Sequence, residues 1–175
     1  MIASMPEALL TREAAEAAAI AAGQFTTNAE IIARLAERLR RKPPAFVVTC
    51  ARGSSDHAAT YGKYLIERTL GLPVASLGPS LASVYGGQLD LSGALFIAVS
   101  QSGRSPDALR LTEAAKRGGA LVVGFVNDEA SPLAGLVDVL VPLHAGPEHS
   151  VAATKSYLAT CIAFLHLVSV WSEDP

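Results

Sequence analysis

The stretch ALFIAVSQSGRSPD, residues 94–107, contains the features that decide the fold. Residues 94–99 are apolar throughout, which is the pattern of a strand covered on both faces of a sheet. The residues that follow supply hydroxyl groups, an amide and a glycine. Ser105 suits a helix N-cap, and Pro106 suits the first helical position, where a missing N–H is not needed. The stretch therefore predicts a buried strand that leads through a polar loop into a helix.

The same alternation of strand and helix extends in both directions along the chain. Short apolar runs predict four further strands, at residues 45–49, 73–77, 120–126 and 137–141. Helices are predicted at residues 55–70, 80–85, 106–117 and 151–171. This order is typical of an α/β protein with an open parallel sheet between two helical layers. Ligands bind such sheets beyond the carboxyl ends of the strands, so we expect function in the loops that follow the strands.

The amino-terminal segment is rich in alanine and in charged residues. We expect Thr11 to open one helix there, and Asn28 to open a second helix that runs to Arg41. A basic run and two prolines end that second helix. The expected organisation is an N-terminal helical segment over residues 1–42 and one α/β domain over residues 43–175.

Composition excludes several classes of partner. The chain has 175 residues, of which 50% are hydrophobic and 17% charged, and its net charge is -2. This apolar content suffices for one packed domain, and the near-zero charge offers no field to attract nucleic acid or an acidic membrane. The longest apolar stretch is short for a membrane span, and Met1 is not followed by a basic segment that leads into an apolar run, so we expect neither an anchor nor a signal peptide. We therefore expect a cytoplasmic protein without nucleic-acid or membrane partners.

Cysteine and histidine residues are too scattered for a redox or metal site. Cys50 and Cys161 lie in apolar surroundings without CxxC spacing, which predicts reduced, buried thiols. The four histidines have no ligand spacing with cysteines or carboxylates. Neither a nucleoside-triphosphate loop nor a dinucleotide-binding glycine motif is present in the sequence. We therefore expect no metal and no cofactor.

Two of the loops that follow strands carry hydroxyl groups at predicted helix starts. Ser100, Gln101, Ser102 and Ser105 follow one strand, and Ser55 follows another. A helix N-terminus supplies partial positive charge and free N–H groups, which suit a phosphate monoester. The pair of loops favours a small phosphorylated metabolite. Helix capping alone is the alternative explanation of serine-rich turns.

Together with the segment GPEHSVAATK, residues 146–155, these loops resemble the sugar isomerase (SIS) domain family. The SQSG motif at residues 100–103 is typical of the whole superfamily. The pattern Glu-x-x-Val-Ala-x-Thr-Lys at residues 148–155 is typical of its tandem branch, which includes the isomerase half of glucosamine-6-phosphate synthase and related deaminases. The resemblance covers the chain from about residue 8 and implies a flavodoxin-like fold, with a SIS phosphosugar-binding domain over residues 43–175.

The resemblance also implies roles for single residues. It assigns phosphate binding to Ser55, Ser100, Gln101, Ser102 and Ser105, and contact with the sugar to Ser54, Val151 and Ala153. Ala153 stands where the family often has a serine, which removes one possible sugar contact. Arg104 replaces an acidic residue common in the synthases and is expected to add positive charge beside the phosphate.

The function implied is that of a module binding a hexose or hexosamine 6-phosphate, in an enzyme acting at C1 and C2 of the sugar. The reaction type is conversion of glucosamine 6-phosphate to fructose 6-phosphate, with isomerisation or amino transfer as related reactions. We expect the first half of a tandem enzyme, inactive alone, because the family's catalytic glutamate, histidine and lysine fall in the second module or its tail. A non-catalytic phosphosugar sensor and a complete one-module isomerase stay open.

Four residues of the chain are candidates for catalysis. His57 could shuttle a proton during ring opening, Glu148 and His149 could supply a base, and Lys155 could form a Schiff base. Each also has a purely structural explanation, in packing, pairing or solvation. The apolar stretch at residues 158–171 and the alanine-rich amino-terminal helices predict more apolar surface than one domain needs, and hence a homodimer or larger oligomer.

Overall fold

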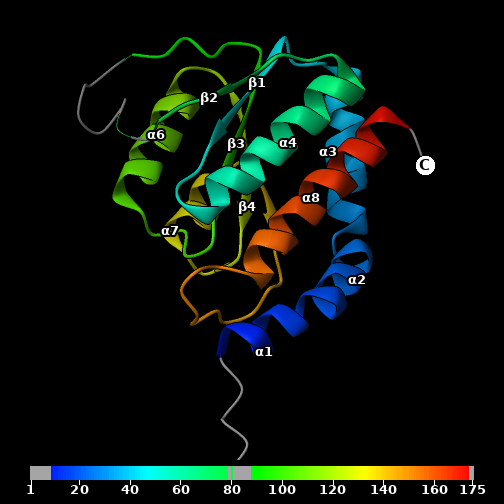
Figure 1. Cartoon of the computed structure of the whole chain (residues 1–175). Coiled ribbons are helices and arrows are strands. Elements are labelled where there is room, and N and C mark those ends of the chain that lie inside the picture. Colours follow the sequence, from blue (N-terminus) through cyan, green and yellow to red (C-terminus); the bar gives the residue numbers. More distant parts are fainter. Residues whose placement is uncertain (1–8, 79, 81–87, 174–175) are drawn as a thin grey trace, which may run out of the picture.

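The structure, a computed structural model, describes residues 9–78, 80 and 88–173 (Figure 1). Within these residues, five parallel strands form one sheet in the order β2-β1-β3-β4-β5. They are β1 (Phe46–Cys50), β2 (Val74–Ser76), β3 (Ala94–Ser100), β4 (Leu121–Val126) and β5 (Val139–Pro142). The predicted parallel α/β fold is confirmed, and each predicted strand is present with its ends shifted by at most two residues.

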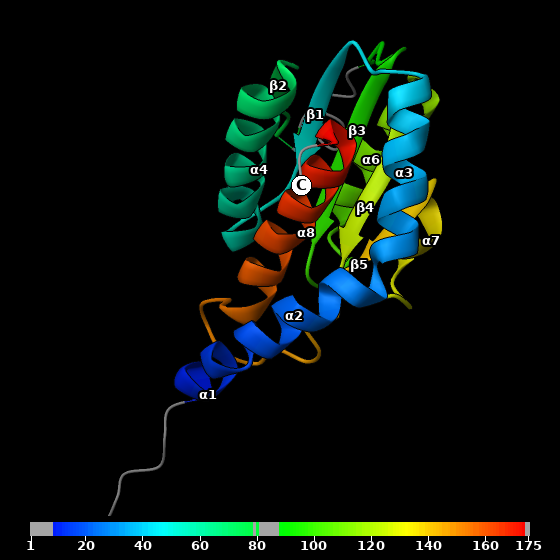
Figure 2. The same ribbon diagram turned by 90° about the vertical axis from the view of Figure 1, so that its right-hand side faces the viewer.

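Helices cover both faces of this sheet, so the molecule has three layers (Figure 1), and Figure 2 looks onto one of the two helical layers. One face carries α3 (Ala29–Arg41), α4 (Ser54–Leu70) and α8 (Lys155–Ser172). Helix α2 (Ala17–Thr27) packs against α8, and α1 (Leu9–Ala15) precedes it. The other face carries α6 (Pro106–Arg117) and α7 (Pro132–Leu136).

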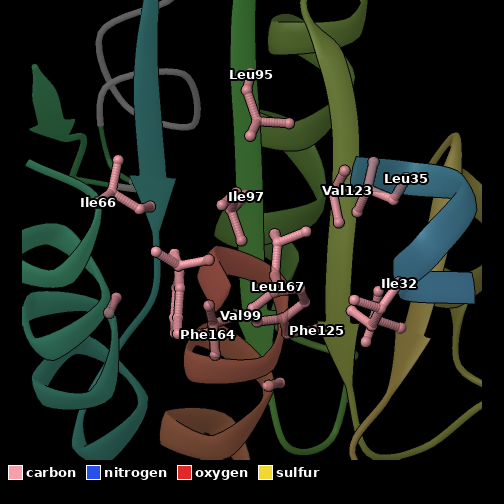
Figure 3. Close-up of a cluster of buried hydrophobic side chains, with 14 of the residues drawn as sticks. Ile32, Leu35, Ile66, Leu95, Ile97, Val99, Val123, Phe125, Phe164 and Leu167 are labelled. Atoms are coloured by element: carbon pink, nitrogen blue, oxygen red, sulfur yellow. The ribbon is translucent and has the colours of Figure 1, made fainter. Parts of the chain in front are cut away.

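Strand β3 lies in the middle of the sheet and contributes to both hydrophobic cores. Leu95, Ile97 and Val99 belong to the core on the α8 side, whereas Phe96 and Ala98 belong to the core on the α6 side. Figure 3 shows the first set together with Phe164 and Leu167 of α8. Alternate side chains point to opposite faces of a strand, so coverage of both faces explains why the whole segment is apolar.

Several expected helix boundaries are wrong. Leu9 is already helical in α1, so Thr11 lies inside this helix and does not open it. Helix α8 begins at Lys155, not at Val151, because the residues before Lys155 belong to a loop. Helices α2 and α7 were not expected as separate elements, although Ser131 caps α7 with its side chain. The helix expected at residues 80–85 lies outside the described residues apart from position 80.

Most of the apolar stretch in α8 is buried within the chain. Its inward residues pack against α2, α3 and α4, and Phe164 contacts Phe125 of β4 edge-on at a ring-centroid distance of 4.8 Å. Cys50 is buried as predicted, whereas Cys161 is only partly buried, and both thiols are free. No helix within the described ranges is long and apolar enough to cross a membrane.

Gly62 allows α4 to pack closely on α8. A Cβ atom at this position would overlap the ring of Phe164, which is itself fully buried. We therefore predict that Gly62→Ala destabilises the protein by about 1–3 kcal/mol relative to Gly23→Ala, which is the usual range for overpacking. Chemical denaturation followed by circular dichroism would measure the difference in the free energy of unfolding.

Gly23 is the matched control for this substitution. It also lies inside a helix, α2, but nothing lies within 4 Å of a Cβ built there. Both substitutions gain the same helix propensity, about 1 kcal/mol for alanine over glycine, so the comparison isolates the contact with Phe164. Equal stability of the two variants would contradict close packing of α4 on α8.

Candidate functional site

A cleft of about 200 Å³ lies beyond the carboxyl ends of β1 and β3. Both strands contribute a loop to it, and the described lining is Ala51, Arg52, Ser55, Val99, Ser100, Gln101, Ser102, Ser105 and Ala108. The two strands are paired neighbours, with Cys50 opposite Ala98, so their loops leave the sheet side by side. The structure thus brings together all five residues that were predicted to hold phosphate.

Two helices begin at this cleft. Ser55 lies in the first turn of α4, and Ser105 is the N-cap residue of α6 with Pro106 in the first turn, as predicted. The N-cap residue of α4 is Gly53, which has no side chain, and the side chain of Ser105 makes no capping hydrogen bond to α6. The first N–H groups of a helix have no partner inside the helix and carry the positive end of its dipole. The cleft therefore combines hydroxyl groups with two helix N-termini, an arrangement that suits an anion.

The loop after β3 depends on a glycine. Gly103 has a φ of 62°, and a Cβ atom there would overlap the hydroxyl of Ser131. The N–H of Gly103 donates to the Ser100 hydroxyl at 2.9 Å, and the Gly103 carbonyl accepts from the N–H of Leu133 at 3.2 Å. These contacts hold the loop against the start of α7 and set the path of the residues that line the cleft.

Two arginines bring positive charge to this edge of the sheet. Arg52 lines the cleft, and its Nη1 lies 2.8 Å from Oδ2 of Asp107, which links the loop after β1 to α6. Nη2 of Arg104 lies 2.8 Å from Oδ2 of Asp128, and Arg104 is outside the described lining. The cation at the cleft is thus Arg52, which the sequence analysis did not single out. The available signal was its place in the loop two residues after a buried strand.

The three residues expected to approach the sugar lie outside the described lining of this cleft. Ser54 begins α4 directly before Ser55. Val151 is fully exposed and Ala153 is partly buried, both on the loop between β5 and α8. Contact of these residues with a sugar stays a prediction.

Glu148 has a structural role at the start of α8. Its Oε1 accepts hydrogen bonds from the N–H groups of Thr154 at 2.8 Å and Ser156 at 3.3 Å, and its Oε2 accepts one from the Ser156 hydroxyl. A carboxylate at this position satisfies N–H groups that lack helical partners and complements the helix dipole. These bonds also explain why α8 begins at Lys155.

The other catalytic candidates lie in different surroundings. Lys155 is only 3% exposed, and its Nζ lies 2.7 Å from Oε2 of Glu16, so it is paired within the fold. His57 in α4 and His149 in the loop after β5 both have exposed side chains. Among the described residues, no group of three histidine, cysteine or acidic side chains could hold a metal ion.

The thiol of Cys50, which directly precedes the cleft residue Ala51 in sequence, is not reactive at neutral pH. Cys50 ends β1 and is 1% exposed. Burial, with a smaller contribution from the nearby carboxylate of Asp56, raises the pKa of the Cys50 thiol to about 12. The thiol is therefore protonated at neutral pH, and a thiolate nucleophile is not part of this site.

Known proteins share both the sequence and the fold of this chain. A sequence profile of the SIS domain family matches residues 44–170. A glutamine–fructose-6-phosphate aminotransferase (isomerizing) of Thermus thermophilus is 39% identical over 127 residues, which are 71% of this chain and 20% of the relative. The crystal structure of a protein described as a phosphosugar isomerase from Silicibacter pomeroyi shares 51% identity with a TM-score of 0.92, covering 95% of this chain and 51% of that one.

A more distant structure has the same fold. It is an E. coli protein in complex with arabinose 5-phosphate, with a TM-score of 0.76 and 18% identity, covering 94% of this chain and 88% of that one. The chain spans about a fifth of the length of the Thermus relative and about half of the Silicibacter protein. The profile match over most of the chain agrees with the motifs around the cleft, and we conclude that this chain belongs to the SIS domain family.

Proposed function

We propose that this chain binds the phosphate group of a hexose or hexosamine 6-phosphate in the cleft between the loops after β1 and β3. The observation that carries this proposal is that four serines and Gln101 line one cleft where two helices begin, one of them after a glycine N-cap and the other after Ser105, which makes no capping bond. The cleft, at about 200 Å³, is smaller than the roughly 300 Å³ of the smallest pockets that enclose a whole ligand. Its size suits a phosphate group, with most of the sugar outside.

We also propose that the bound sugar reacts at C1 and C2, as in glucosamine-6-phosphate deamination or isomerisation. Family membership supports this, together with a relative whose name specifies amino transfer to fructose 6-phosphate. Such a reaction needs a base that moves a proton between the two carbons. In this chain the carboxylate of Glu148 is bound to the start of α8 and Lys155 to Glu16. The chain would therefore supply substrate binding, as the first half of a tandem enzyme.

A second candidate is a complete one-module isomerase. The observation that favours it is the E. coli structure with arabinose 5-phosphate, of which this chain covers 88%. In that case His57 and His149 are the candidates for proton transfer, because their side chains are exposed near the carboxyl edge of the sheet.

Ser102→Ala is predicted to weaken binding of fructose 6-phosphate about tenfold or more. A hydrogen bond to a charged group contributes about 1.5–3 kcal/mol, and the Ser102 side chain lines the cleft. Titration calorimetry with fructose 6-phosphate and with fructose measures the effect. Ser92→Ala, at the amino end of β3, is the control and should not change either affinity. Equal affinity of the wild type for both ligands would overturn the phosphate site.

The purified chain is expected to bind glucosamine 6-phosphate without releasing ammonia or fructose 6-phosphate. The physical reason is that its candidate carboxylate and amine are held in structural contacts. Binding measured on the same preparation shows that the chain is folded while turnover is assayed. Robust turnover would refute the half-enzyme proposal and favour the one-module isomerase.

We propose that the chain works as a cytoplasmic homodimer. Large apolar side chains remain exposed on the neighbouring helices α4 and α8, namely Tyr61 at 40%, Tyr64 at 67%, Leu158 at 44% and Leu165 at 38%. Exposed apolar surface of this kind is common at subunit interfaces. Light scattering at high micromolar concentration is expected to give at least the dimer mass, and Tyr64→Glu should shift the protein toward monomer. A monomeric wild type would contradict this proposal.

A further inference from the structure

Glu13 is a buried carboxylate that binds a distant loop. It lies on α1, is 3% exposed, and accepts hydrogen bonds from the N–H groups of His149 at 2.7 Å and Ser150 at 3.0 Å. Hydrogen bonds between an ionised acceptor and a backbone amide are about twice as strong as neutral ones. The Ser150 side chain, followed by the His149 amide, holds the pKa of Glu13 at about 2. The carboxylate therefore stays ionised at neutral pH.

The same helical segment also binds both ends of this loop. Gln24 of α2 donates from Nε2 to the Leu143 carbonyl at 2.7 Å, directly after β5. At the other end, Oε2 of Glu16 lies 2.7 Å from Nζ of Lys155, the first residue of α8. The connection from β5 to α8 is thus held against α1 and α2 at its start, middle and end.

Asn127 joins this connection to the cleft. Its Nδ2 donates to the Gly146 carbonyl at 2.8 Å, and its Oδ1 accepts from the Ala145 N–H at 2.8 Å. Its own N–H donates to the carbonyl of Ser100, a residue that lines the cleft, at 3.2 Å. A continuous set of hydrogen bonds therefore runs from the cleft, through Asn127, to the loop that Glu13 holds.

We infer that Glu13 is a positioning residue, which holds residues 148–151 where they contact the sugar of a bound hexose 6-phosphate. The inference rests on the proposed function. Val151, one of the three residues expected to approach the sugar, directly follows Ser150, and its side chain is fully exposed. What Glu13 holds in place is therefore the backbone of this segment. Glu13 bonds the loop after β5, whereas the loop after β3 is also held by its own contacts through Gly103. Loss of Glu13 should therefore affect the sugar end of the ligand and spare the phosphate end.

The test compares fructose 6-phosphate with inorganic phosphate as ligands of the whole chain. The two amides bond different oxygens of Glu13, and Glu13→Gln keeps the size of the side chain but replaces one of these oxygens with an NH2 group, which cannot accept a hydrogen bond. Its affinity for fructose 6-phosphate is expected to fall about tenfold, the loss typical of one charge-assisted hydrogen bond, while its affinity for inorganic phosphate stays unchanged. A general loss of stability would lower the affinity for both ligands alike. A lower affinity for fructose 6-phosphate alone therefore separates positioning from a purely structural role.

Glu30→Gln is the matched control. Glu30 lies on α3, its side chain is 76% exposed, and it pairs with Arg34 of the same helix. This variant should bind both ligands like the wild type. The inference is wrong if Glu13→Gln binds both ligands as tightly as the wild type does. It is also wrong if this variant loses affinity for both ligands equally. If the wild type binds neither ligand, the proposed function itself fails, which is a separate outcome.

Amide hydrogen exchange on the wild type keeps the inference testable even if the Glu13 variant does not fold. Fructose 6-phosphate is expected to slow exchange at the His149 and Ser150 amides, because sugar contact fixes a segment already bound to Glu13. Inorganic phosphate should leave the exchange rates of these two amides unchanged. Equal slowing by both ligands, or by neither, would overturn the inference.

Discussion

Parallel pairing of β1 with β3 determines where the site lies. Cys50 faces Ala98 in this register, so both strands end at the same edge and their loops leave the sheet together. Helices cover both faces of the sheet, which restricts polar ligand-binding groups to the region beyond the strand ends. Ser55 and Ser102, which are far apart in sequence, therefore line one cleft.

The helix N-termini of the α/β layers fall into two kinds. The first N–H groups of a helix need partners, and α7 and α8 find them within the chain, through the Ser131 hydroxyl and the Glu148 carboxylate. Helices α4 and α6 begin at the cleft and have no hydrogen bond to an N-cap side chain. Ser105 at the N-cap of α6 makes no capping bond and is one of the residues that line the cleft. Helix α3 also lacks a bond to its N-cap side chain, so what distinguishes α4 and α6 is that they begin at the cleft.

Helices α1 and α2 give the long connection after β5 a defined path. Burial of a charge is costly unless the charge is paired or hydrogen-bonded, and the buried groups at this contact meet that requirement. Glu13 accepts from two backbone amides, and Lys155 pairs with Glu16. A connection without helix or strand between residues 143 and 154 is thereby tied to the same helical layer that packs on α8.

The sequence by itself determined the order of the five strands and of helices α3, α4, α6 and α8, because apolar runs such as residues 94–99 and a Ser-Pro helix start are local signals. It also indicated the loops that meet at the cleft, since parallel strands end at one edge. Only the tertiary structure decided that Arg52 lines the cleft, and that Lys155 is buried and paired with Glu16. The Lys155 contact, and that of Glu13 with His149, join residues more than a hundred positions apart. Such contacts depend on how helices pack across the sheet, and packing of that kind leaves no pattern in neighbouring residues.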